Sequence, residues 1–120
     1  MRVLFIGDVV GKPGREGLSA TMPALREAHK PELVIVNAEN AAGGVGTTEE
    51  PAKEIFAAGA DAITLGNHAY RHREVYPYLE AEARIVRPAN FPDSHPGRGH
   101  TIVDAAGRKV AVLNLSGSLH

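Results

Sequence analysis

Three short apolar runs occupy the first half of the sequence and restrict the folds that are open to it. Residues 2–7, 33–36 and 61–65 are rich in β-branched and aliphatic side chains, and intervening stretches long enough for a helix separate them. Apolar runs without alternation predict strands buried on both faces, which are typical of parallel sheets. Parallel neighbours need a crossover connection, so the alternation of strands with helices predicts βαβ units.

Polar side chains follow each of these runs. Asp8 comes directly after the first run, Glu39 and Asn40 come shortly after the second, and Asn67 and His68 follow the third after a glycine. Because the carboxyl ends of parallel strands meet at one edge of a sheet, these groups are expected to converge on a small volume, as in a metal site. The alternative is ordinary turn chemistry, in which Asp or Asn ends a strand and Asn67 caps a helix with a surface histidine.

The stretches between the runs have helical patterns. Apolar residues at helical spacing predict a helix over residues 15–29, in which Pro23 is expected to cause a kink or a break. A second helix is predicted to begin after Thr48 and to end at Gly59, and a third covers about residues 73–81. The order of elements therefore predicts three successive crossovers.

The remainder of the chain completes the predicted fold. A short strand at residues 85–86 precedes an irregular stretch over 87–99, which is long enough to suggest a function. Residues 101–104 and 109–114 flank a turn with a glycine and predict a β-hairpin. The predicted fold class is α/β, with βαβ units forming a mainly parallel sheet and a C-terminal β-hairpin, in a single domain of residues 1–120.

Composition excludes several classes of partner and chemistry. Thirteen basic and fourteen acidic residues give a net charge of −1, which does not favour duplex nucleic acid or an anionic membrane as a partner. The sequence has no cysteine, so a metal site has to use oxygen and imidazole ligands. The first apolar run is too short to span a membrane and lacks the features of a signal peptide, so a cytoplasmic location is expected. Residues 9–14 match neither the P-loop nor the dinucleotide-binding fingerprint.

Four motifs together resemble the YmdB-like branch of the calcineurin-like metallophosphoesterases. They are GDVVG at residues 7–11, NAENAAGG at 37–44, LGNH at 65–68 and RPAN at 87–90. The resemblance covers essentially the whole sequence in order. It implies that the chain corresponds to the amino-terminal half of a four-layer sandwich with a two-metal centre, usually of iron or manganese. Such enzymes hydrolyse phosphoesters, and cyclic nucleotides such as 2',3'-cyclic AMP are among the substrates.

The resemblance also implies a role for each residue of the motifs. Asp8 and Asn40 would hold one metal ion, Asn67 would hold the other, and Glu39 would bridge the two. His68 would donate a proton to the departing alkoxide, a task that suits an imidazole near neutral pH. Two metal ions in this arrangement share a hydroxide and neutralise the phosphate oxygens.

The sequence departs from the wider superfamily at two positions. Val10 stands where a histidine is usual, although valine also occurs in this branch, and Ala69 stands where an acidic residue is usual. The family also draws three further histidine ligands from its second half, and no segment of these 120 residues matches it.

Three hypotheses about function follow. The first is a metal-dependent phosphodiesterase that acts on a small phosphoester. The second is a catalytically incomplete half-domain that binds metal weakly and self-associates into a homo-oligomer through an exposed apolar face. The third is a flavodoxin-like binding domain in which the strand-end residues only cap loops and no metal binds.

Overall fold

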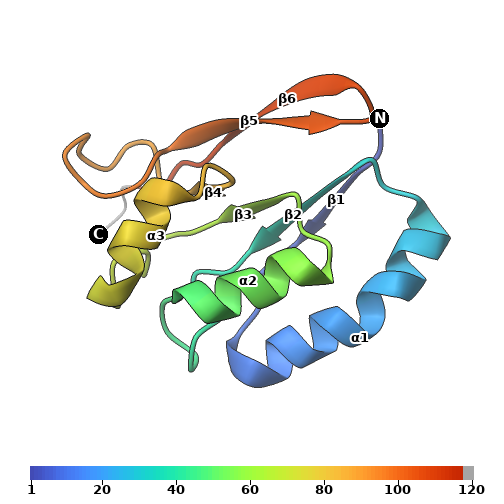
Figure 1. Ribbon diagram of the computed structural model, residues 1–120, viewed down its shortest axis with the longest axis horizontal. Helices are drawn as coiled ribbons and strands as arrows, with labels where there is room; N and C mark the ends of the chain where they lie inside the picture. The colour runs from blue at the N-terminus through green and yellow to red at the C-terminus, as the bar shows by residue number, and fades with distance from the viewer. Residues whose placement is uncertain (118–120) are drawn as a thin grey trace.

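Helices, a parallel sheet and an antiparallel hairpin form three layers in the computed structural model, which describes residues 1–117 (Figure 1). In chain order, the elements are β1 (Val3–Ile6), α1 (Gly11–His29), β2 (Leu33–Asn37), α2 (Glu49–Ala58), β3 (Ala62–Thr64), the 3₁₀ helix η1 (Arg73–Val75), α3 (Tyr76–Ala81), β4 (Ile85–Val86), β5 (His100–Ala105) and β6 (Arg108–Leu113). The predicted α/β class, with a parallel sheet and a C-terminal hairpin, is confirmed.

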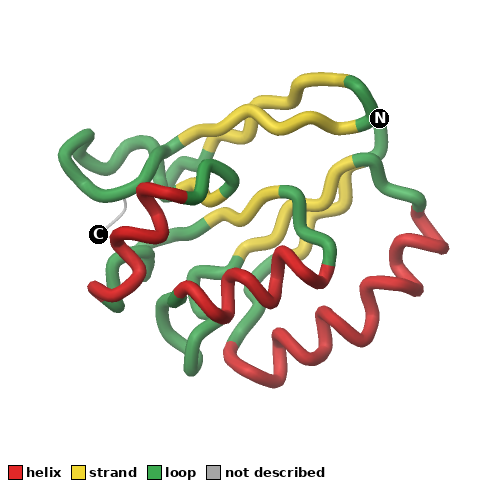
Figure 2. The backbone as a smooth tube through the Cα atoms, viewed as in Figure 1, coloured by secondary structure: helices red, strands yellow, loops and turns green. Residues whose placement is uncertain are grey.

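The four-stranded sheet has the order β1-β2-β3-β4, and every neighbouring pair is parallel. Helices α1 and α2 lie on one face of this sheet, and the hairpin of β5 and β6 lies on the other (Figure 2). All four strands therefore end at the same edge, as the sequence predicts. This edge carries the loops that contain the candidate site residues.

The core between the helices and the sheet is aliphatic. Leu18 and Met22 of α1 and Ile55 of α2 pack against Val34 and Ile63 of the two central strands, and all five side chains are buried. Because these helical residues recur every three or four positions on one face, the helices bury one stripe and expose the other side.

A second, smaller core lies between the sheet and the hairpin. Alternate residues of the hairpin point inward, among them Val103 and Val112, and they contact Leu33, Ala62 and Val86. The hairpin forms a two-stranded sheet of its own and does not extend the parallel sheet. An isolated bridge between residues 86 and 98 pairs β4 with the segment just before β5.

The prediction that the first strand is buried on both faces is wrong. Val3 and Phe5 are 53% and 57% exposed, respectively. Strand β1 lies at the edge of the sheet, and the sheet residues that are buried in the core beneath the hairpin belong to β2, β3 and β4. An apolar run that does not alternate can therefore include an edge strand with one open face.

Helix α1 differs from its predicted extent. It begins at Gly11, because Pro13 stands in the first turn, where its missing N–H has no partner to lose, and the Gly14 N–H donates to the Val10 carbonyl at 3.1 Å. The helix also continues through Pro23, which does not split it. Since the buried side chain of Met22 anchors the helix beside the proline, packing compensates for the hydrogen bond that is lost.

Gly17 is an open position of α1 at which the effect of an added Cβ can be measured. It lies on the exposed side of the helix, and a Cβ atom there would contact nothing within 4 Å. We expect Gly17→Ala to raise the free energy of unfolding by about 0.5–1 kcal/mol, because alanine loses less backbone entropy on folding. Urea denaturation followed by circular dichroism measures the change.

Gly59, at the end of α2, is the matched control. Its φ is 121°, and a Cβ would lie 2.8 Å from a guanidinium nitrogen of Arg26. Gly59→Ala is therefore expected to lower the stability. A destabilised Gly17→Ala would contradict the description of that position as an open, regular helix site.

Candidate functional site

The loops after the first three strands lie side by side at the carboxyl edge of the sheet. The backbone N–H of Val9 donates to the carbonyl of Asn37 at 3.1 Å, and the N–H of Gly11 donates to that of Asn40 at 2.9 Å. These bonds fix the loop after β1 against the loop after β2. Asp8, in the loop after β1, has a φ of 48°, a left-handed conformation that aspartate tolerates better than most residues.

Four of the five predicted site residues form one contact network. The carboxylate of Asp8 accepts a hydrogen bond from Nδ2 of Asn40 at 3.5 Å, and Oδ1 of Asn40 lies 2.7 Å from Nδ1 of His68. The same imidazole nitrogen is 3.8 Å from Oε2 of Glu39. The expectation that three separate strand ends converge is thus met in the geometry of these side chains.

The orientation of Asn40 determines which nitrogen of His68 carries a proton. Oδ1 of Asn40 also accepts the backbone N–H of Gly46 at 3.4 Å, while its Nδ2 faces Asp8. Because an amide oxygen only accepts, Nδ1 of His68 acts as the donor in this contact. Nε2 of the imidazole is therefore the nitrogen that remains for another partner.

The carboxylate of Glu39 occupies space that a glycine leaves free. A Cβ atom on Gly66 would overlap both carboxylate oxygens of Glu39, so only glycine lets this carboxylate lie against the backbone after β3. Nδ2 of Asn37 approaches Oε1 of the same carboxylate at 3.5 Å. The side chain of Glu39 is 20% exposed, which leaves part of it open to a ligand.

Asn67 has a different environment from the other four residues. No side-chain hydrogen bond within residues 1–117 joins it to them, but it lines a cavity of about 500 Å³ together with Glu39. Other polar groups in the wall come from Asn37 and Thr64, and the apolar part of the wall comes from Phe5, Leu113 and Leu115. The structure therefore brings Asn67 to the same opening without placing it in the network.

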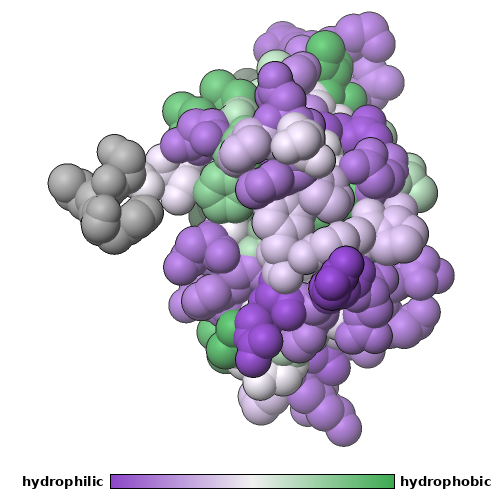
Figure 3. Space-filling view, turned by 90° about the vertical axis from the view of Figure 1, so that its left-hand side faces the viewer, coloured by the Kyte–Doolittle hydropathy of each residue, from purple (hydrophilic) through white to green (hydrophobic). Residues whose placement is uncertain are grey.

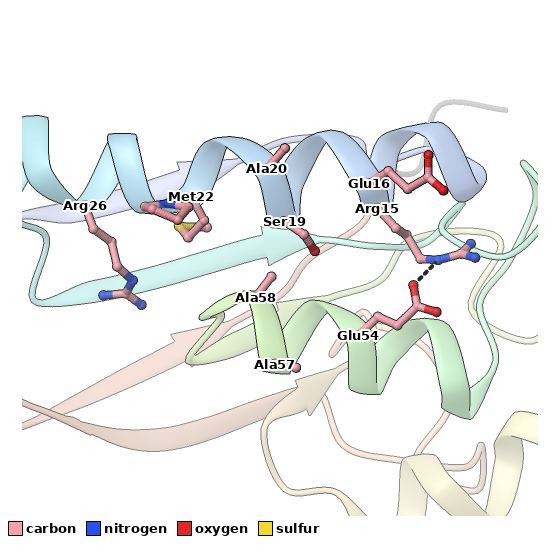
Figure 4. Close-up of a pocket in the computed structure, with 10 residues that line it drawn as sticks. Arg15, Glu16, Ser19, Ala20, Met22, Arg26, Glu54, Ala57 and Ala58 are labelled. Atoms are coloured by element: carbon pink, nitrogen blue, oxygen red, sulfur yellow. Dashed lines mark hydrogen bonds and ion pairs between the residues drawn. The ribbon is translucent and has the colours of Figure 1, made fainter.

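The surface at this edge is mostly hydrophilic. Figure 3 looks onto the side toward which the strands of the parallel sheet run, and hydrophobic residues appear there only as separate patches. A larger groove of about 860 Å³ lies elsewhere, between α1 and α2, where Arg15 and Glu54 form an ion pair of 2.6 Å (Figure 4). None of the five predicted site residues lines it.

The segment after His68 is anchored by aromatic packing. The hydroxyl of Tyr70 donates to the carbonyl of Pro96 at 2.6 Å, and its ring packs edge-on against those of Tyr76 and His95. Burial raises the pKa of Tyr70 above its ordinary value, although the nearby guanidinium of Arg87 opposes this shift. Tyr70 consequently stays protonated and keeps its hydrogen bond at neutral pH.

The predicted donor set fits a metal ion that prefers oxygen ligands. Asp8 and Glu39 supply carboxylates and Asn40 and Asn67 supply amide oxygens, while the imidazole of His68, the predicted proton donor, lies beside them. These ligands suit manganese or iron. Over the described part of the chain, however, no three His, Asp or Glu side chains cluster in a way that could hold an ion, so the amides would have to contribute.

Sequence reasoning missed three residues that support the site. Gly66 makes room for the carboxylate of Glu39, Asn37 approaches that carboxylate, and Asn114 donates to the carbonyl of Leu65 at 2.5 Å. Asn37 and Asn114 both lie where a predicted strand ends, as the predicted ligands do. The same signal could therefore have identified them.

Comparison of the chain with known proteins identifies a matching family and several relatives. A family model described as YmdB-like protein matches residues 4–120. The 2',3'-cyclic-nucleotide 2'-phosphodiesterase of Bacillus subtilis is 48% identical over 117 residues, which are 98% of this chain and 44% of that protein. A putative phosphatase/phosphodiesterase of Mycoplasma genitalium is 32% identical over 122 residues, covering 98% of this chain and 43% of that protein.

Two solved structures share the fold. A hypothetical protein from Thermus thermophilus matches with a TM-score of 0.88 and 41% identity, over 98% of this chain and 45% of that one. A novel phosphatase from Mycoplasma pneumoniae matches with a TM-score of 0.88 and 31% identity, over 97% and 43%. The chain thus spans less than half the length of the relatives it matches. In residues 1–117, no helix is both long enough and apolar enough to cross a bilayer.

Proposed function

Since the chain belongs to the YmdB-like protein family, we propose that it supplies the strand-end half of a metal-dependent phosphodiesterase site. The substrate class is a small phosphodiester such as a 2',3'-cyclic nucleotide. The observation that carries the proposal is the contact network from Asp8 through Asn40 to His68 and Glu39, since it joins three strand ends around potential ligands. The name of the Bacillus subtilis relative supports the substrate class.

The proposed ligands have distinct roles. Asp8 and Asn40 would hold one metal ion and Asn67 the other, while Glu39 would bridge the two, with iron or manganese as the metals. Bound metal ions would act as Lewis acids and lower the pKa of a water molecule. Glu39 suits the bridging role because its two oxygens lie beside Gly66, within reach of the loops after β2 and β3.

His68 is the proposed proton donor. Its Nδ1–H is directed at Oδ1 of Asn40, so the ring is oriented with Nε2 available to protonate a leaving oxygen. As a general acid, His68 would also carry a proton on Nε2, and the carboxylate of Glu39 lies 3.8 Å from the Nδ1 of the same ring. The side chain of His68 is 39% exposed, which leaves room for a substrate to approach.

A second proposal rests on the small number of anionic ligands. Asp8 and Glu39 are the two carboxylates of the network, and Phe5 and Leu113 leave apolar surface exposed beside the cavity. A catalytically incomplete half-domain, residues 1–120, would bind metal weakly and self-associate through this surface. Under either proposal, the site belongs to a protein expected in the cytoplasm.

Turnover by the wild-type chain separates the two proposals, and His68→Ala tests the role of His68. If His68 is the general acid, this variant is expected to lower kcat by about 10²- to 10⁴-fold while the metal content is retained. The measurement is hydrolysis of 2',3'-cyclic AMP and of a bis-aryl phosphodiester, with elemental analysis of the same sample.

The controls are an outer histidine and a metal ligand. His100→Ala, on the exposed side of β5, is expected to leave both quantities unchanged, whereas Asp8→Ala is expected to remove metal and activity together. Turnover that survives His68→Ala would contradict its role as the acid. No turnover by the wild-type chain, despite bound metal, would favour the incomplete half-domain.

A further inference from the structure

Asn114 links the hairpin to the loop that carries two of the candidate site residues. It lies directly after β6, and its side-chain Nδ2 donates two hydrogen bonds, one to the carbonyl of Leu65 at 2.5 Å and one to that of Val86 at 3.0 Å. Its backbone is equally constrained, because its N–H donates to the carbonyl of Gly99 at 3.1 Å and its carbonyl accepts the N–H of Ala89 at 2.7 Å.

The register between β3 and β4 ends before it reaches the Leu65 carbonyl. The last register pair between β3 and β4 is Thr64 with Val86, and the N–H of Leu65 donates to the Val86 carbonyl at 2.9 Å. The Leu65 carbonyl lies beyond that pair, so the ladder has no further strand residue opposite it. Both amide hydrogens of Asn114 are used at the ends of these two strands.

The residues after Leu65 are the ones that face the site. Gly66 contacts the carboxylate of Glu39, and the next two residues are Asn67 and His68. Within this loop, the N–H of Ala69 donates to the Gly66 carbonyl at 3.0 Å, which makes it a tight turn. The turn follows directly on the peptide group between Leu65 and Gly66, so its position depends on how the Leu65 carbonyl is held.

We propose that Asn114 is a positioning residue for the Gly66–His68 turn. By fixing the carbonyl of Leu65, it sets where His68 lies relative to Asn40 and where Asn67 enters the cavity that Asn114 itself lines. This role rests on the proposed function for its catalytic consequence. Small displacements of a catalytic group can lower the rate by about 10²-fold, so the effect of losing this contact falls on kcat.

Three substitutions at position 114 weaken the two side-chain hydrogen bonds to different degrees. Asn114→Ala removes both donors, Asn114→Ser keeps one hydroxyl that can donate to one carbonyl, and Asn114→Asp preserves the shape but presents a carboxylate to two carbonyl oxygens. The expected order of activity is Asn, Ser, Ala and Asp, with a fall in kcat of at least about 10-fold for Asn114→Ala and little change in KM. If packing alone mattered, Asn114→Asp would behave like the wild type.

Asn90 provides a matched control. Its side chain also makes two hydrogen bonds across these segments, to the carbonyl of Ser116 at 2.7 Å and from the N–H of Ser116 at 3.0 Å, and neither of them involves β3. Asn90→Ala is therefore expected to cost stability without moving the turn.

The readout that does not require turnover is the imidazole resonance of His68 in a ¹H–¹³C NMR spectrum of the 120-residue chain, assigned with His68→Ala. A shift of this resonance in Asn114→Ala and Asn114→Asp, but not in Asn90→Ala, supports the proposal. An unchanged resonance, or an equal shift in Asn90→Ala, would overturn it. If the wild-type chain has no activity, the proposed function fails, but the NMR comparison still decides the role of Asn114.

Discussion

Gly66→Ala is expected to weaken metal binding by at least about 10-fold while the fold is retained. A Cβ at this position would overlap the two carboxylate oxygens of Glu39, which form the end of a flexible side chain and can swing away without moving the backbone. Because Glu39 is the proposed bridging ligand, its displacement is expected to weaken Mn²⁺ binding by at least about 10- to 100-fold, the loss typical when groups that orient metal ligands are removed. Calorimetric titration with Mn²⁺ measures this change.

Gly17→Ala is the control for Gly66→Ala, since it makes the same chemical change at an open position of α1. It should leave Mn²⁺ binding at the wild-type value. The circular dichroism spectrum of Gly66→Ala should match that of the wild type. Unaltered Mn²⁺ affinity in a folded Gly66→Ala protein would show that the carboxylate of Glu39 has no part in binding.

Gly99→Ala is expected to have the largest effect on stability. A Cβ at residue 99 would overlap the backbone of Ala89, which cannot move aside as a side chain can, and Gly99 is itself buried. The backbone of Asn114 also bonds to the Gly99 carbonyl, so a shift here would separate the hairpin from the loop after β4. We expect a loss of about 3 kcal/mol in the free energy of unfolding, at the upper end for overpacking.

Gly107→Ala separates overlap from backbone strain. Gly107 has a φ of 79° in the turn between β5 and β6, and nothing lies within 4 Å of a Cβ there. Its substitution is expected to cost only about 1–2 kcal/mol, because the left-handed conformation is unfavourable for alanine. Chemical denaturation of both variants gives the comparison. Equal losses for the two would mean that residue 99 is not in close contact with residue 89.

The sequence predicted the parts of the fold that depend on short-range patterns. Apolar runs separated by helical stretches gave the parallel sheet, and the rule that parallel strands end at one edge brought Asp8, Asn40 and His68 together. The glycine at the end of α2 also ends that helix in the structure, as its position predicts.

Features set by distant contacts could not be predicted in the same way. The open face of β1, with Phe5 exposed, depends on which strands the hairpin covers. The need for glycine at position 66 depends on the carboxylate of Glu39, and the role of Asn114 depends on a carbonyl 49 residues earlier in the chain. Each of these requires the packing of whole elements, which no local pattern contains.

The assignment of metal ligands stays a prediction, as does the role of His68. The described residues bring two carboxylates, an amide and an imidazole into contact, and Asn67 lies at the cavity beside them. The comparisons establish the family and the fold, but the chain covers 44% of the Bacillus subtilis relative. The activity therefore has to be measured on the 120-residue chain itself.

The most direct test of the account is Mn²⁺ binding by the 120-residue chain, measured from the free-ion signal in electron paramagnetic resonance. We expect saturable binding by the wild type that is lost in the double variant of Asp8→Ala and Glu39→Ala and retained in Gly17→Ala. Absence of binding by the wild type, or equal binding by the double variant, would contradict the proposal that the strand-end residues form a metal site.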